Sequence, residues 1–384
     1  MKLRHLKIQN FKGIREFETD FTDDLGRIRD LTLIVGPNGS GKTSILDAIW
    51  FGLWGELGYR KLRKSFREEP EYVVTTSQRY AQIDYHISIS DSELEMIRKW
   101  KKELIEREAI DYQPEPDTKN IEFSWTYPSQ PNYREVKEHW SGHGGYKWGN
   151  PFDWDILQGR KYASDLQKLT AQRIPGRDSI GGLHFFEQER QIIAKPVFKY
   201  QPVPDGDLFE DDGNSKDDPP DDLRLLLIDF GLKDKIRSSS DDEKSWYQII
   251  RDSYNYICAP HEMGEVYALS SGSEYEIEFQ DSDGLNYGFD GLSSGERSVL
   301  NFMVQYVYKR MRSSIVLIDE LEQHLHPTWQ RRLMQNLLRL NDGNQFIVTT
   351  HSPAIQQAAP SDSIIELGKL SEQIPDWQLA EAGE

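Results

Sequence analysis

Three short apolar runs predict buried strands and set the organisation of the chain. Residues 31–35, LTLIV, form the first run, as in a parallel strand that is buried on both faces. A glycine-rich turn follows at 36–41, and 42–54 then space apolar residues along one helical face: Ile45, Leu46, Ile49 and Leu53. The order strand, loop, helix predicts the opening of an α/β unit.

The same alternation of helix and strand returns near the other end of the chain. Residues 295–312 show a helical pattern, SSIVLIDE at 313–320 predicts a second buried strand, HPTWQRRLMQNLLRL at 326–340 a helix, and NQFIVTTHS at 344–352 a third strand. The opening residues 2–11 alternate less cleanly and suit a strand near a sheet edge.

The residues between these two regions carry weaker signals. We expect a strand near 81–89, helices near 91–108 and 153–172, a helical pattern over 223–257, and a hairpin over 274–289 that turns at Ser282-Asp283-Gly284. Heptads are not sustained anywhere, so no long coiled coil is expected.

Composition and charge narrow the class of protein. The chain has 384 residues, of which 29% are charged and 37% hydrophobic, and it shows neither a membrane span nor a signal-peptide core. Its only cysteine, Cys258, excludes a disulfide framework and a cysteine-based zinc site, which fits a cytoplasmic protein. The net charge is −18, and residues 205–222 hold nine acids against Lys216 alone, as in a solvated linker. This balance does not favour nucleic acid as a partner, and no membrane partner is expected.

A glycine-rich loop carries the clearest chemical signal. Residues 36–43 fit G-x-x-x-x-G-K-[ST] between a predicted strand and a predicted helix, the context of a phosphate-binding loop. The glycines let backbone N–H groups turn toward a phosphate, and the helix N-terminus adds partial positive charge. Lys42 is expected to reach the β- and γ-phosphates of ATP, and Thr43 to place its hydroxyl on Mg²⁺. The cofactor-binding residues of this loop are Gly36, Pro37, Asn38, Gly39, Ser40, Gly41, Lys42, Thr43 and Ser44.

Three further motifs follow at defined distances. The second buried strand ends in Asp319 and Glu320, at the sheet edge where α/β proteins bind ligands. Asp319 is expected to hold the Mg²⁺ shell, and Glu320 to polarise the attacking water. The segment GLSSGER at 291–297 places small residues before a helix and predicts a second anion site. Gly295 lies 24 residues before Asp319, and His351 lies 32 residues after it, an order far more specific than any single motif.

With these motifs the chain resembles an ATP-binding-cassette ATPase of the soluble SMC/RecF/OLD-like group. The resemblance covers about residues 1–54 and 285–366, and the segments IQNFKGI and LEQHLHP are closer to the OLD-like, defence-associated branch than to transporter cassettes. It implies an α/β ATPase head with a mixed sheet flanked by helices and an N-terminal antiparallel β lobe. A large helical or irregular insertion would replace the long coiled coil of other members.

The resemblance also implies which residues act and how the site is completed. It makes 36–43 the Walker A motif, 315–320 the Walker B motif and 291–297 the signature, with Glu320, Lys42 and the switch residue His351 as catalytic residues. Family members form homodimers with two ATP molecules between the subunits, so that the signature of one subunit closes on the γ-phosphate of the other. The signature residues assigned to that contact are Ser293, Ser294, Gly295 and Glu296.

Other assignments from the resemblance leave alternatives open. Gln188 is assigned to the glutamine loop that joins the metal and the γ-phosphate, with Gln172 as a poorer alternative inside a helical pattern. Lys12 or Arg15 is expected near the nucleotide. The remaining alternatives concern His324 and His326, as dimer contacts or a weak metal signal, and the cation clusters at 60–67 and 98–102, as solvated helix faces or nucleic-acid contacts.

These signals divide the chain into seven expected segments. They are the first part of the head at 1–54, an insertion at 55–180, the glutamine-loop region at 181–202, an acidic linker at 203–222, a helical segment and hairpin at 223–290, the second part of the head at 291–366, and a tail at 367–384.

Three functions are consistent with such a head. The first is an ATPase that dimerises on ATP and controls a separate effector, a nuclease or a toxin, in bacterial anti-phage defence. Larger OLD-like proteins append a nuclease domain, whereas only about 18 residues follow the last predicted strand in this sequence. The second is a repair or recombination ATPase that clamps DNA, and the third is a nucleotide-gated scaffold with little turnover.

Overall fold

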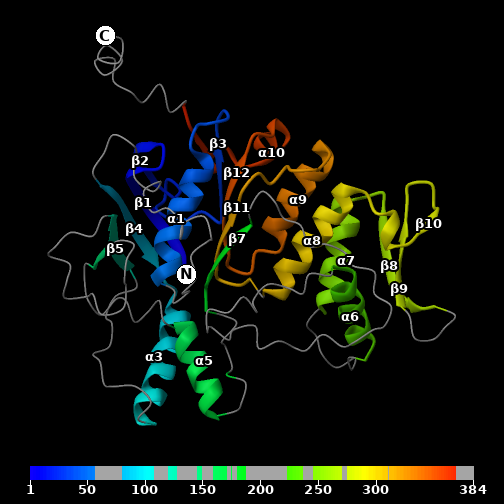
Figure 1. Cartoon of the computed structure of the whole chain (residues 1–384), viewed down its shortest axis with the longest axis horizontal. Helices are drawn as coiled ribbons and strands as arrows, with labels where there is room; N and C mark the ends of the chain where they lie inside the picture. Colours follow the sequence, from blue (N-terminus) through cyan, green and yellow to red (C-terminus); the bar gives the residue numbers. More distant parts are fainter. Residues whose placement is uncertain are drawn as a thin grey trace.

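The described part of the chain forms three sheets with helices packed between and around them (Figure 1). The computed structural model describes residues 1–56, 80–107, 120–127, 145–148, 159–170, 174, 180–186, 223–236, 245–269, 275–309 and 311–368. Among the sequence features that lie outside these residues are Gln172, Gln188, the cation cluster at 60–67 and the acidic linker at 203–222.

A five-stranded parallel sheet forms the centre of the head. Its order is β13 (Ile364–Glu366), β3 (Leu31–Val35), β12 (Gln345–Thr350), β11 (Ile315–Ile318) and β7 (Leu183–Phe186), with every neighbouring pair parallel. All residues of β3, β12 and β11 are buried, because alternate side chains enter two different cores. The three strands predicted from apolar runs are thereby confirmed.

The first core lies between this sheet and a five-stranded antiparallel sheet. Helix α1 (Lys42–Glu56) contacts strands of both sheets. The antiparallel sheet has the order β2 (Ile14–Asp20), β1 (Lys2–Phe11), β4 (Ala81–Ser88), β5 (Asn120–Tyr127) and β6 (Gly145–Trp148). The pairing of β1 with β4 shifts register between Leu3 and His5, which explains the uneven alternation of this strand and lets Leu3, Leu6 and Ile8 all be buried.

Part of the predicted insertion at 55–180 belongs to this N-terminal sheet. Strands β4, β5 and β6 extend the hairpin of β1 and β2, so the region is not purely helical or irregular. Helices α3 (Asp91–Glu106) and α5 (Gly159–Thr170) pack against each other and extend away from the head (Figure 1). They have 16 and 12 residues, so the described residues contain no long coiled coil.

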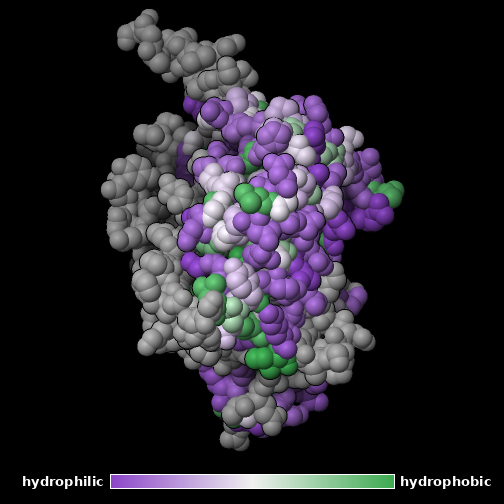
Figure 2. Space-filling model, turned by 90° about the vertical axis from the view of Figure 1, so that its right-hand side faces the viewer, coloured by the Kyte–Doolittle hydropathy of each residue, from purple (hydrophilic) through white to green (hydrophobic). Residues whose placement is uncertain are grey.

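The second core covers the other face of the parallel sheet. It is formed by α6 (Leu223–Ile236), α7 (Trp246–Ile257), α8 (Ser294–Tyr308), α9 (Pro327–Arg339), α10 (Pro353–Ala358) and an antiparallel sheet of β10 (Asn286–Tyr287), β9 (Tyr275–Gln280) and β8 (Glu262–Ala268). The hairpin predicted at 274–289 is confirmed by β9 and β10, whereas β8 carried no signal that we recognised. The outer face of this region is mostly hydrophilic, with separate small apolar areas (Figure 2). None of the described helices has both the length and the apolar character to cross a membrane.

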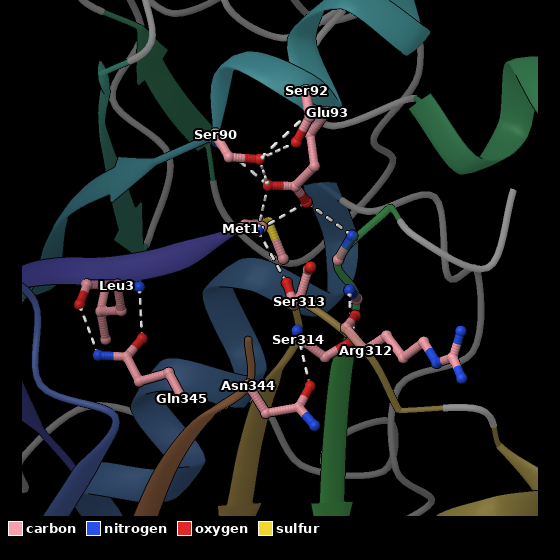
Figure 3. A network of polar contacts seen from close by, with 12 residues as sticks. Met1, Leu3, Ser90, Ser92, Glu93, Arg312, Ser313, Ser314, Asn344 and Gln345 are labelled. Carbon is pink, nitrogen blue, oxygen red and sulfur yellow. Dashed lines mark hydrogen bonds and ion pairs between the residues drawn. The ribbon is translucent and has the colours of Figure 1, made fainter. Parts of the chain in front are cut away.

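A buried polar network joins the N-terminal sheet to the head (Figure 3). The ammonium of Met1 lies 2.6 and 2.7 Å from the carboxylate oxygens of Glu93, which also caps α3 together with Ser90. The side-chain amide of Gln345 pairs with both the backbone N–H and the carbonyl of Leu3, at 2.6 and 2.8 Å. Burial alone would raise the pKa of Glu93, but the ammonium outweighs it and lowers that pKa.

Candidate nucleotide-binding site

The glycine-rich loop connects the end of β3 to the first turn of α1. Gly39 and Gly41 have φ values of +76° and +90°, which only glycine adopts without strain. The Nζ of Lys42 donates to the carbonyl oxygens of Gly36 and Pro37, at 3.0 and 3.1 Å. Burial lowers the pKa of Lys42, and the nearby carboxylates of Glu320, Asp319 and Glu322 offset part of that effect. The loop therefore holds a buried cation against its own backbone carbonyl oxygens.

Thr43 and Asp319 face each other across the carboxyl edge of the parallel sheet. The Oγ1 of Thr43 lies 3.2 and 3.1 Å from the two carboxylate oxygens of Asp319, although 276 residues separate them in the chain. Asp319 is 5% exposed, whereas Thr43 is exposed. One hydroxyl and one carboxylate at the mouth of a phosphate loop fit Mg²⁺, which prefers hard oxygen ligands shared with substrate phosphates. The structure thus brings together the two residues named for the magnesium site, and their role as Mg²⁺ ligands stays a prediction.

Glu320 follows directly in an unusual backbone conformation. Its φ is +49°, a region that non-glycine residues adopt rarely and mostly at functional sites. Its backbone N–H donates to the Oγ1 of Thr349 at 2.9 Å, and the same hydroxyl donates to Asp319 at 2.6 Å. Thr349, near the end of β12, thereby holds the carboxylate of Asp319 and the backbone of Glu320.

His351 comes directly after β12, beside the loop that follows Glu320. Its backbone N–H donates to the Oε1 of Glu322, and the hydroxyl of Thr350 donates to the other carboxylate oxygen at 2.7 Å. The sequence motifs named above do not include Glu322, Thr349 or Thr350. Two sequence features could have indicated them: the pair of threonines directly before His351, and a second glutamate three residues after Asp319.

Ser293 and Ser294 lie exposed at the N-terminus of α8. Ser293 is the N-cap, and its side chain accepts from the backbone N–H of Glu296 at 3.3 Å. Gly295 packs tightly behind them, since a Cβ there would lie 2.9 Å from the carbonyl oxygen of His324. The predicted signature therefore presents small polar residues at a helix N-terminus, the arrangement that favours an anion.

Glu296 is placed differently from the other signature residues. It is 2% exposed, and its Oε1 accepts from the hydroxyls of Tyr254 and Tyr287, both at 2.5 Å, with the Nδ1 of His261 at 3.1 Å. Burial alone would raise the pKa of Glu296, but the hydrogen bonds, led by Ser293, outweigh it and lower the pKa to about 2. Its side chain thus faces α7 and β10 rather than solvent, so the carboxylate supports the signature and does not present itself to a ligand.

Several weaker assignments have other partners in the structure. Lys12 donates to Asp47 of α1 at 2.5 Å, which ties the N-terminal hairpin to the helix after the phosphate loop. His326 is the N-cap of α9 and accepts from Thr328. Within the cation cluster at 98–102, Trp100 and Lys101 are each 3% exposed, so neither presents a surface to nucleic acid.

Two family models and several curated proteins match this chain. Residues 155–355 match the family model AAA_21, described as "AAA domain, putative AbiEii toxin, Type IV TA system", and residues 5–138 match the AAA_23 model, described as "AAA domain". The Septu protein PtuA of Bacillus thuringiensis is 22% identical over 95% of this chain and 76% of its own length. The Retron Ec83 probable ATPase of Escherichia coli is 21% identical over 95% of this chain and 71% of its own length.

A solved structure shares the fold. It is described as the SmcHead bound to the C-winged helix domain of ScpA, with a TM-score of 0.51, 16% identity, and coverage of 94% of this chain and 92% of that chain. The head-like α/β fold expected from the resemblance is thus confirmed. Because the AAA_21 model spans more than half of its residues, this chain belongs to the AAA_21 family of P-loop ATPase domains.

Proposed function

We propose that this chain is an ATP-hydrolysing switch, that ATP joins two copies head to tail, and that the switch controls a separate effector in bacterial anti-phage defence. The observation that carries the ATPase part is the placement of Thr43 against both carboxylate oxygens of Asp319. The hydroxyl that follows the phosphate loop and the carboxylate that follows β11 meet there, as nucleotide hydrolysis requires.

The chemistry assigns one task to each group of the site. The buried ammonium of Lys42 gains a stronger, charged partner when a β- or γ-phosphate oxygen replaces the two carbonyls it now contacts. When bound by Thr43 and Asp319, Mg²⁺ supplies charge neutralisation on the phosphate oxygens. Glu320 orients the water that attacks the γ-phosphorus, and it takes the proton as the bond from that phosphorus to the ADP oxygen breaks. His351 donates a hydrogen bond to the γ-phosphate.

The α8 N-terminus completes the site of a second copy in this proposal. Ser293 and Ser294 are exposed there, and the first N–H groups of a helix attract an anion. A γ-phosphate held by the phosphate loop of another copy has the matching charge. In a two-fold dimer the contact occurs twice, so ATP bridges the subunits and hydrolysis releases them.

The proposed role in defence rests on the relatives. A Septu protein and a retron ATPase each align with 95% of this chain, and the sequence resembles the defence-associated branch. In the cation cluster at 98–102, Lys99 and Lys102 are exposed, but Trp100 is buried and offers no ring on which a base could stack. The net charge of −18 likewise does not favour the alternative of DNA clamping. We therefore place the output of the switch in a protein partner, a nuclease or a toxin.

Phosphate release by the purified chain tests the enzymatic part. We expect turnover that needs Mg²⁺ and falls at least about 100-fold in Glu320→Gln and Lys42→Ala. Glu320→Gln should still bind ATP, whereas Lys42→Ala should bind it weakly. The matched control is Glu95→Gln on the exposed face of α3, which should hydrolyse ATP normally. Wild-type turnover indistinguishable from that of Glu320→Gln would contradict the enzymatic proposal and favour a nucleotide-gated scaffold.

Purification of tagged Glu320→Gln from the native host with ATP tests the biological part. A second polypeptide at fixed stoichiometry supports the effector proposal. Recovery of duplex DNA that salt displaces, with no second polypeptide, would contradict it and support DNA clamping.

A further inference from the structure

The loop after β11 is joined to the loop after β12 by a continuous series of hydrogen bonds. Besides the bonds of Thr349 to Asp319 and Glu320, the backbone N–H of Leu321 donates to the carbonyl of Thr349 at 3.3 Å. The next contacts are made by side chains, and we call them the loop clasp. Its members are Glu322, Gln330, Thr350, His351 and Ser352.

Glu322 is the centre of the loop clasp. One of its carboxylate oxygens accepts from the backbone N–H of His351, and the other accepts from the hydroxyl of Thr350. Hydrogen bonds to an ionised acceptor are about twice as strong as neutral ones. The hydroxyl of Thr350 also accepts from the backbone N–H of Ser352 at 3.0 Å. The carboxylate therefore holds the backbone on both sides of His351 without touching its imidazole.

Gln330 of α9 closes the loop clasp from the other side. Its Nε2 donates to the carbonyl of Leu325 at 2.8 Å, and its Oε1 accepts from the hydroxyl of Ser352. Gln330 and Ser352 are 9% and 7% exposed, so water competes little for these bonds. The two loops are thus fixed to one helix as well as to each other.

The same loop meets the signature. The carbonyl oxygen of His324 lies where a side chain at Gly295 would have to fit, and the ring of Trp329 lies beside it. A displacement of residues 319–325 would therefore act both on His351 and on the N-terminus of α8.

We propose that Glu322 is a positioning residue that sets His351 for the γ-phosphate and makes His351 move together with the loop after Glu320. This inference rests on the proposed function, since His351 needs a γ-phosphate to act on. Glu322 acts through the backbone of His351, and it neither contacts the nucleotide nor exchanges a proton.

The test compares Glu322→Ala, Glu322→Gln and the surface control Glu95→Gln. Glu322→Ala removes both acceptors, so we expect kcat to fall at least about 10-fold while KM for ATP changes less than about 3-fold. The glutamine amide retains an oxygen for the N–H of His351 and an NH₂ that can donate to Thr350. Glu322→Gln should therefore recover most of the rate that alanine loses. Equal loss in both variants would overturn the proposal, because a carboxylate that takes part in the chemistry is not replaced by an amide.

Amide hydrogen exchange gives a readout that does not depend on turnover. In Glu322→Ala the peptide that contains His351 should exchange at least about 10-fold faster, while the peptide that contains β11 keeps its protection. If wild type hydrolyses ATP and Glu322→Ala matches it in rate and exchange, this inference fails and the proposed function stands. If wild type shows no turnover, the proposed function fails, and unchanged exchange at His351 would then overturn the inference as well.

Discussion

The hydroxyl of Thr43 lies 3.1–3.2 Å from the carboxylate oxygens of Asp319, although the strands that precede these two residues are not neighbours in the sheet. Thr43 follows β3 and Asp319 follows β11, whereas β12 lies between these strands in the sheet. Thr349, at the end of β12, fills the gap and donates to Asp319 at 2.6 Å. Three elements distant in the chain therefore build one oxygen-lined edge, as parallel sheets do at their carboxyl ends.

Replacement of Thr43 by valine tests this edge. Thr43→Val keeps the shape of the side chain but removes the hydroxyl, so we expect ATP hydrolysis to fall about 100-fold and the Mg²⁺ requirement to rise. Thr43→Ser restores the hydroxyl and should retain activity within about 5-fold. Phosphate release at several Mg²⁺ concentrations measures both effects. A Thr43→Val chain with the Mg²⁺ dependence of wild type would show that the hydroxyl has no part in metal binding.

The tyrosines on Glu296 should contribute to stability through one shared oxygen. Tyr254→Phe removes a buried hydrogen bond to a carboxylate, so we expect the free energy of unfolding to fall by about 1.5–3 kcal/mol. Tyr287→Phe acts on the same oxygen. Each single variant leaves the other hydroxyl to satisfy that oxygen, so the double variant should lose more than the sum of the two single losses. Tyr256→Phe, on the same helix α7 but with an exposed hydroxyl contact, should cost less than about 0.5 kcal/mol. Urea denaturation of the four variants measures these free energies. If the losses of Tyr254→Phe and Tyr287→Phe simply add in the double variant, the two hydroxyls do not share an acceptor.

Acid should remove the contribution of Glu296 to stability. Its pKa is lowered to about 2 in the folded chain from the ordinary value of 4.5, so its stabilisation is complete above pH 4.5 and is lost as the pH falls toward 2. Glu296→Gln lacks this titration. We therefore expect the stability deficit of Glu296→Gln relative to wild type to shrink by about 1–3 kcal/mol between about pH 6 and pH 3. A deficit that stays constant over this range would show that Glu296 is not held ionised by its partners.

Replacement of Gly295 by alanine would raise helix propensity but would place a Cβ too close to neighbouring atoms. Alanine in a helix is favoured over glycine by about 1 kcal/mol, so an open position would be stabilised. A Cβ at Gly295 would instead lie 2.9 Å from His324 O and 3.2 Å from the ring of Trp329. We expect a net loss of about 1–3 kcal/mol in unfolding free energy, with Ser294→Ala at the exposed neighbour causing less than about 0.5 kcal/mol. A gain in stability for Gly295→Ala would contradict the contact between signature and loop.

Local patterns predicted the elements that carry the nucleotide motifs. The strand at Leu31–Val35, the helix that starts at Lys42, and the strands before Asp319 and His351 were expected from apolar runs and are found in place. The three strands are buried on both faces, so their apolar composition alone distinguishes them from the rest of the chain. The resemblance added the order of the motifs and the family, and the AAA_21 match confirms the family.

Contacts between distant segments were beyond the local pattern. β8 is an edge strand whose pairing shifts register between Met263 and Val266, its two buried residues. Because of this shift, its apolar residues do not alternate. Glu322 looked like one more acid in a polar loop, because its partners Thr350 and His351 lie 28 and 29 residues away, at the end of β12 and directly after it. Glu296 belonged to a recognised motif, yet its burial depends on hydroxyls from α7 and β10 that no local pattern links to it.

The molar mass of Glu320→Gln in solution, measured by light scattering with and without Mg²⁺ and ATP, tests the central claim most directly. Without nucleotide we expect the mass of one chain, 44.7 kDa, and with ATP the mass of two. Adding Ser293→Arg to the same chain should leave ATP binding intact and keep the mass at one chain, because the signature would no longer accept the partner's phosphate. A mass that ATP does not change in Glu320→Gln, in a preparation that binds ATP, would contradict the account of two copies joined through the nucleotide.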